Sequence, residues 1–121
     1  MENMNNEVKS LQGAAAEEIA AAIAEALDSK KGRDIKVIKV GDKTVIADYF
    51  VIANGTSSTH VKSLADEVEF KMGQAGLTPL HTDAGDGRSW IALDYANVIV
   101  HVFDREAREF YNLDRLYTEF E

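Results

Sequence analysis

Cysteine is absent from this chain, and so is a long apolar stretch without charged residues. Without cysteine there is no disulfide, no thiolate nucleophile and no cysteine-ligated metal site, which is consistent with a reducing compartment. The longest apolar stretch, residues 14–27, contains Glu17, Glu18 and Glu25. It therefore fits neither a membrane span nor a signal peptide. We expect a cytoplasmic protein without membrane contact.

Basic residues are scarce as well. The chain has 13 lysines and arginines against 21 aspartates and glutamates, a formal net charge of −8. Binding to a nucleic-acid backbone needs a basic stripe that releases counterions. Direct nucleic-acid binding is therefore not expected as the main contact, and a basic protein surface is the favoured kind of partner.

The length of 121 residues and the hydrophobic content of 45% fit one compact domain. Residues 1–13 are mostly polar and have no periodicity, which predicts a flexible N-terminal arm. We expect a single domain over residues 14–121.

Apolar residues recur at spacings of three and four in three segments, which predicts three amphipathic helices. They begin near residues 14, 59 and 105, and the last extends to about residue 117. Either Ser57, Ser58 or Thr59 is expected to cap the second helix, and Asp104 the third. The predicted buried positions are Ala15, Ile19, Ile23, Ala26 and Leu27, then Val61, Leu64, Ala65, Val68 and Met72, then Ala107, Phe110, Leu113 and Tyr117.

Strands are predicted at residues 34–40, 44–54, 90–94 and 98–103, with a short one near Leu80. The second has no charge from Tyr49 to Ala53 and is expected to be buried on both faces. Only three residues separate the strand at 90–94 from that at 98–103, so these should form an antiparallel hairpin. The order of elements predicts an α/β fold with a mixed sheet packed by about three helices.

The turn from Gly55 to Ser58 joins a strand to a helix, where backbone N–H groups can bind phosphate. It matches neither dinucleotide-binding nor P-loop motifs, and we prefer the interpretation of a capped helix. Nucleotidyltransferases use a similar turn but also need paired carboxylates to hold magnesium. On the strand at 90–94, the neighbour of Asp94 on the same face is Ala92, so the second carboxylate of such a pair is missing.

Metal ligands are not expected either. His60, His81 and His101 are not at ligand spacing, and Asp83 and Asp86 are interpreted as turn residues. His101 interrupts an apolar strand and should make a satisfied hydrogen bond. We predict no catalytic residues, no metal site and no cofactor.

Trp90 and Tyr95 are the candidate anchors of an interface. If Ile91 and Leu93 point into the core, the alternation of a strand displays Trp90 on the other face. Tryptophan and tyrosine are enriched at binding hot spots because they are large and stiff and can donate a hydrogen bond. The alternative, that Trp90 is part of the core, remains open, and Asp94 could simply start the turn.

Four segments in this order and spacing resemble the ribosomal silencing factor family, also called Iojap. They are KGRDI (31–35), IADYFVIANGTSSTHV (46–61), WIALDY (90–95) and VIVHVF (98–103). The resemblance extends over about residues 31–117. Ala96 and Asn97 stand where family members often have Gly and Asp.

The resemblance implies a fold similar to nucleotidyltransferases without their catalytic carboxylates. It also implies a translation repressor that binds the large ribosomal subunit through ribosomal protein L fourteen. Such a protein would block joining of the small subunit when nutrients are scarce, and could be a homodimer when free. The implied partner-binding residues are Trp90, Asp94, Tyr95, Phe103 and Arg105, supported by Thr56, Ser57 and His60.

Two other functions remain open. One is a magnesium-dependent enzyme of nucleotidyltransferase type, with nucleotide near Gly55 and Ser57. The other is a dimeric acidic scaffold for a different basic partner.

Overall fold

The computed structural model describes residues 10–42, 44–45, 47–84 and 89–111, with α3 side chains described as far as Arg108. The elements are α1 (Ala16–Ser29), β1 (Arg33–Lys39), β2 (Tyr49–Gly55), α2 (Ser58–Gln74), β3 (His81–Asp83), β4 (Trp90–Asp94), β5 (Val98–Asp104) and α3 (Arg105–Tyr111). A mixed sheet packed by helices confirms the predicted α/β fold class. In the described part of the chain, no helix is long and apolar enough to cross a membrane.

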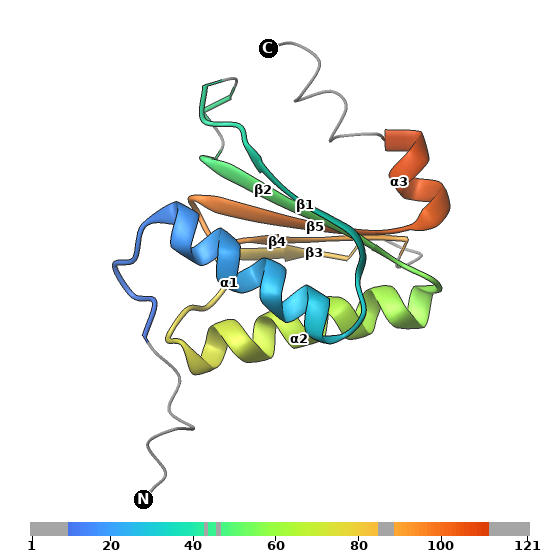
Figure 1. Ribbon diagram of the computed structural model, residues 1–121, viewed down its shortest axis with the longest axis horizontal. Coiled ribbons are helices and arrows are strands. Elements are labelled where there is room, and N and C mark those ends of the chain that lie inside the picture. Colours follow the sequence, from blue (N-terminus) through green and yellow to red (C-terminus); the bar gives the residue numbers. More distant parts are fainter. Residues whose placement is uncertain (1–9, 43, 46, 85–88, 112–121) are drawn as a thin grey trace, which may run out of the picture.

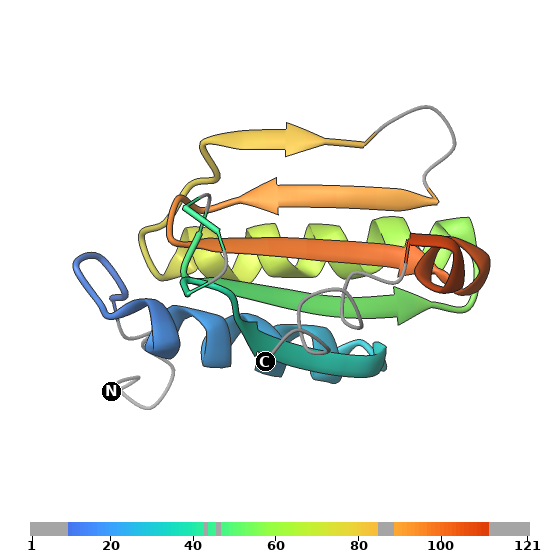
Figure 2. The same ribbon diagram turned by 90° about the horizontal axis from the view of Figure 1, so that it is seen from above.

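The sheet has the strand order β1-β2-β5-β4-β3. β2 and β5 run parallel at its centre, and the other neighbours are antiparallel. All but the first residue of β2 are buried, which confirms the expected central strand. The hairpin of β4 and β5 is also confirmed, and β3 is the short strand expected near Leu80. Figure 2 shows the strands side by side in this order.

Helices α1 and α2 lie together on one face of the sheet (Figure 1). The five buried positions of α2 are the five predicted from the sequence, and four of the five in α1 also agree. The difference is Ala15, which is the exposed residue before α1, while Ala20 is buried in its place. This face forms the larger core, with the strands contributing side chains such as Val51, Val100 and Leu93.

The other face carries a smaller core and α3 (Figure 1). Its strand residues include Phe50, Ile52, Ile99 and Phe103, and Trp90 packs against them. Asp104 accepts a hydrogen bond from the backbone N–H of Ala107 at 2.8 Å, which confirms it as the cap of α3. Helices therefore pack on both faces of the sheet, α1 and α2 on one and α3 on the other.

One predicted strand boundary was wrong. The second strand was expected from residue 44 but begins at Tyr49, because the Asp48 carbonyl accepts from the backbone of Val40 and Gly41 and so closes a loop. The domain boundary at residue 14 stays a prediction; just before it, Leu11 is buried and its N–H donates to the carbonyl of Ala75. Residues 1–9 and the predicted end of the last helix, with Leu113 and Tyr117, lie outside the described residues.

The turn between β4 and β5 contains a backbone conformation that alanine rarely adopts. Ala96 has a φ of 75°, in the left-handed region. The Asp94 carboxylate accepts from the N–H of Ala96 at 2.7 Å, and the N–H of Tyr95 bonds the carbonyl of Val98. These bonds hold the tight turn, so Ala96 retains a strain that glycine would not have.

Replacing Ala96 with glycine is therefore expected to raise the free energy of unfolding by about 1 kcal/mol. Urea denaturation of the two proteins measures this. Ala21→Gly is the matched control, because Ala21 is exposed inside α1 and the same exchange there should lower stability by about 1 kcal/mol. Equal losses in both variants would contradict strain at Ala96.

Candidate partner-binding surface

Trp90 is the first residue of β4 and is half-buried on the face that carries the smaller core. Its ring lies against Phe103, with ring centroids 5.0 Å apart, and its indole N–H donates to Nδ1 of His101 at 3.1 Å. The side chain is thus fixed by packing and by a hydrogen bond while part of it stays accessible. The sequence left open whether Trp90 was displayed or core, and it is partly both.

His101 is buried beneath this tryptophan on β5. Its ring makes an edge contact with Phe50, at 4.7 Å between centroids, and stacks with Phe103 at 6.1 Å. Burial lowers the pKa of His101 from 6.5 to about 4, so the ring is neutral at pH 7. Because Nδ1 accepts from Trp90, the proton of the neutral ring is on Nε2, a buried atom without a hydrogen-bond partner among the described residues.

Tyr95 and Phe103 do not lie at the surface, contrary to expectation. Tyr95 is 8% exposed and belongs to the core under α1 and α2, because alternation along the chain turns it away from Trp90. Burial, and secondarily Glu69, raises the pKa of Tyr95. Phe103 is fully buried and supports the Trp90 ring from below. Either residue can act on a partner only through its neighbours.

Asp94 and Arg105 lie apart from each other. Asp94 is half-buried on the same face of β4 as Trp90, four residues further on, or roughly 13 Å away along the strand. One of its carboxylate oxygens holds the turn at Ala96. Arg105 is exposed at the start of α3, two residues after Phe103. The predicted set therefore contains Trp90 and Asp94 on one face, with Arg105 at the end of the adjoining strand.

Thr56, Ser57 and His60 support the start of α2. The Ser57 hydroxyl accepts from the N–H of His60 at 3.1 Å and so caps the helix, as one of the three predicted caps. His60 Nδ1 accepts from the N–H of Thr56 at 2.9 Å, which leaves Nε2 to donate to the Lys30 carbonyl at 2.9 Å. A Cβ on Gly55 would lie 3.0 Å from the Val61 nitrogen, so glycine lets α2 start close to β2.

Comparison with known proteins decides the family. The profile described as ribosomal silencing factor during starvation, RsfS, matches residues 13–121. The chain belongs to the ribosomal silencing factor RsfS family. A relative named ribosomal silencing factor RsfS, from Haemophilus influenzae, is 37% identical over 77% of this chain and 91% of its own length.

Two further relatives extend the RsfS comparison. A mouse protein named mitochondrial assembly of ribosomal large subunit protein 1 is 30% identical over 76% of this chain and 42% of its own length. A crystal structure of a Chromobacterium violaceum protein superposes with a TM-score of 0.81 at 29% identity, covering 85% of this chain and 86% of that one. RsfS relatives thus share both the sequence and the arrangement of elements.

The RsfS sheet gives little support for metal chemistry within its described part. There, no group of three or more histidine, aspartate or glutamate side chains lies together as metal ligands would. Asp94 faces His81 on β3 and Ile99 on β5, so no carboxylate pairs directly opposite it. The names of the RsfS relatives describe a regulator, which agrees with a protein that does not act as an enzyme.

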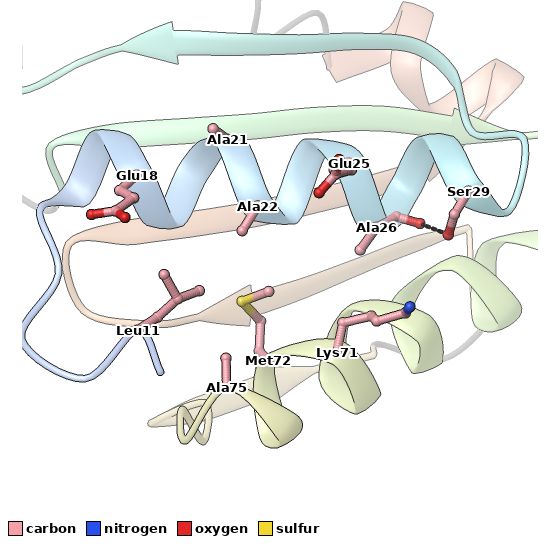
Figure 3. Close-up of a pocket in the computed structure, with 10 residues that line it drawn as sticks. All are labelled: Leu11, Glu18, Ala21, Ala22, Glu25, Ala26, Ser29, Lys71, Met72 and Ala75. Carbon is pink, nitrogen blue, oxygen red and sulfur yellow. Dashed lines mark hydrogen bonds between the residues drawn. The ribbon is translucent and has the colours of Figure 1, made fainter. Parts of the chain in front are cut away.

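A hollow of about 570 Å³ separates α1 from α2 on the opposite side of this RsfS domain (Figure 3). Leu11, Ala26, Met72 and Ala75 form its apolar part, and Figure 3 shows Met72 reaching from α2 toward α1. The hollow stays unfilled because the α1 residues that line it include alanines, whose side chains are small. Its charged residues, Glu18, Glu25 and Lys71, stand along the two helices and do not converge on a point, as a catalytic site requires.

Sequence reasoning missed a second hollow, a polar cleft lined by Arg33, Asp34, Asn54, Gly55, Thr56, Arg105 and Arg108. Arg108 falls within the helix predicted from residue 105, and no role was predicted for it. In the structure it is only 9% exposed. The three-residue spacing of Arg105 and Arg108, which puts both on one side of a helix, was the available signal.

Proposed function

We propose that this protein is a translation repressor that binds the large ribosomal subunit and sterically blocks joining of the small subunit. The observation that carries the proposal is the family match over residues 13–121. It is supported by the relative named for assembly of the ribosomal large subunit. The direct partner is ribosomal protein L fourteen, and the block lowers translation when nutrients are limiting.

The half-buried Trp90 is the centre of the proposed contact surface. A side chain already fixed by Phe103 and His101 loses little rotamer entropy when a partner covers it. Asp94, on the same face, offers its second carboxylate oxygen to a basic group of the partner. Arg105 lies at the margin of this surface. Tyr95 and Phe103 act indirectly, as the buried support of β4 and β5.

The charge of the chain is consistent with this partner. A protein with a formal net charge of −8 is attracted to a basic protein surface and repelled by bare ribosomal RNA. The rate of association should therefore fall as salt concentration rises. The mechanism needs no reaction, because a protein bound where the small subunit docks acts by occupying space. A homodimer of the free protein could cover the same surface until the ribosome is met.

Co-sedimentation with separated ribosomal subunits tests the proposal. The protein should pellet with the large subunit alone, and subsequent addition of small subunits should give fewer joined ribosomes than in its absence. Added instead to ribosomes that are already joined, it should have much less effect, because its surface is then covered. Failure to bind either subunit at low salt would contradict the proposal, as would equal binding to both.

A further inference from the structure

A polar cleft of about 440 Å³ lies at the end of the sheet where β2 and β5 terminate. Figure 2 shows this end, where β2 leads to α2, β5 leads to α3 and β1 begins. Ligands of open α/β sheets bind at the carboxyl ends of parallel strands, and β2 and β5 are the parallel pair here. The volume is in the range of small-molecule sites, about 300–1,000 Å³.

The cleft is basic in an acidic protein. The described residues of its lining include three arginines and one carboxylate, Asp34, which together carry a formal charge of +2 in a chain of −8. Arg33 is on β1, and Arg105 and Arg108 are on α3, so guanidinium groups come from two elements on different sides of the strand ends. Such an arrangement attracts a compact anion that can reach both sides.

One of the three guanidinium groups is held in place. Arg108 is 9% exposed, and its Nη1 donates to the Asn54 side-chain oxygen at 2.9 Å. Asn54 is itself buried, at the end of β2. Arg108 has a further interaction besides the bond to Asn54, so it adds fixed positive charge to the wall of the cleft and leaves the phosphate bonds to the other two arginines. Arg33 and Arg105 are exposed and free to close on a ligand.

The rest of the lining also suits phosphate. Thr56 contributes a hydroxyl just before α2, a helix of 17 residues with no acidic residue in its first turn, so its positive dipole end is not neutralised there. Among the described residues of the lining Asp34 is the only acidic one, which is too few for a carboxylate site that holds magnesium. None of the described residues that line the cleft is aromatic, so none of them can stack on a base.

We propose that this cleft binds a polyphosphate group without a metal ion, either inorganic triphosphate or the phosphate tail of a nucleoside triphosphate. The arginines on two sides favour a chain of phosphates over a single one. Because the described lining offers no aromatic surface for a base, ATP, GTP and inorganic triphosphate should bind with similar affinity. The cleft shares Arg105 with the margin of the proposed ribosome contact, but the proposed binding of phosphate does not depend on that contact.

Calorimetric titration of the full chain at low salt tests the proposal, with inorganic triphosphate, ATP and GTP as ligands. All three should bind in the absence of magnesium, and added magnesium should weaken binding because it neutralises the phosphates. Magnesium-dependent binding would instead indicate a transferase-type site and would overturn the proposal. An unphosphorylated RNA oligonucleotide that binds as well as triphosphate would also overturn it, by assigning the cleft to an RNA backbone.

Four variants locate the site. Arg33→Gln and Arg105→Gln should each weaken triphosphate binding about tenfold, since each loses a charge-assisted hydrogen bond. Asp34→Asn should strengthen it, because it removes the one repelling carboxylate, and asparagine tolerates the φ of 50° found at this position. Lys39→Gln is the matched control, with the same change of charge at an exposed residue at the opposite end of β1.

The Lys39→Gln control distinguishes a specific anion-binding site from attraction by the overall charge of the protein. Unchanged affinity in Lys39→Gln, with losses in the two arginine variants, is the expected result. Similar losses in all three would mean that the anion responds only to net charge, and would overturn the assignment. So would the absence of heat at about 10 mM triphosphate, a concentration above any affinity of functional interest.

Discussion

Trp90→Ala is expected to weaken binding to the large ribosomal subunit roughly thirtyfold, which corresponds to about 2 kcal/mol. The substitution removes the accessible part of the indole ring, the largest rigid side chain of the proposed contact surface. It also removes the donor that bonds Nδ1 of His101 and uncovers the ring of Phe103. Co-sedimentation with a dilution series of large subunits measures the change in affinity.

The same substitution should destabilise the domain, because Trp90 is half-buried. We expect a loss of about 2 kcal/mol in the free energy of unfolding, less than the 3–5 kcal/mol of a fully buried tryptophan. Binding must therefore be measured at a temperature where circular dichroism shows the variant fully folded. A folded Trp90→Ala variant that binds like the original protein would remove Trp90 from the interface.

Trp90→Phe distinguishes a direct contact with the partner from support of the fold. Phenylalanine keeps an aromatic ring on Phe103 but cannot donate to His101, so part of the stability and part of the contact area remain. We expect it to bind with an affinity between those of the original protein and Trp90→Ala. If the two variants differ in stability but not in binding, Trp90 supports the fold without meeting the partner.

The fold could be predicted largely from local patterns. The stripe of α2, including Val61, Leu64 and Val68, was identified without error because a surface helix repeats its buried positions every three or four residues. The unbroken apolar run in β2 identified a central strand for a similar reason. The strand was predicted to begin too early, at residue 44, because β-prone residues such as Val45 gave no sign that the Asp48 carbonyl bonds the backbone of Val40 and Gly41 and closes a loop there.

The candidate site was harder to predict, because it depends on which strands become neighbours. Strand alternation identified the face of Trp90, but only the pairing of β4 with β5 places Phe103 and His101 beneath it. Tyr95 was expected beside Trp90, although one further residue turns it to the other face. Arg33 and Arg108 are 75 positions apart in the sequence, and no local pattern brings them to one cleft.

Acidification should destabilise the domain through His101. Burial lowers the pKa of this histidine from 6.5 in an unfolded chain to about 4 in the fold. Above pH 6.5 the ring is neutral in both states and the fold has its full stability. Between pH 6.5 and about 4 the unfolded chain binds a proton that the folded chain does not, so stability falls with decreasing pH, in total by about 3 kcal/mol. Below about pH 4 this histidine causes no further loss.

Urea denaturation at several values between pH 7 and pH 4 measures this loss, and His101→Asn isolates it from the titration of the carboxylates. Asparagine keeps an acceptor for the Trp90 N–H but has no proton to bind in this range. The difference in unfolding free energy between the two proteins should therefore change by about 3 kcal/mol across the range. Trp90 is the only tryptophan, so the intrinsic tryptophan fluorescence reports the surroundings of its ring beside His101. Parallel pH profiles for the two proteins would mean that His101 is protonated as easily in the fold as in the unfolded chain, and that burial under Trp90 does not keep it neutral.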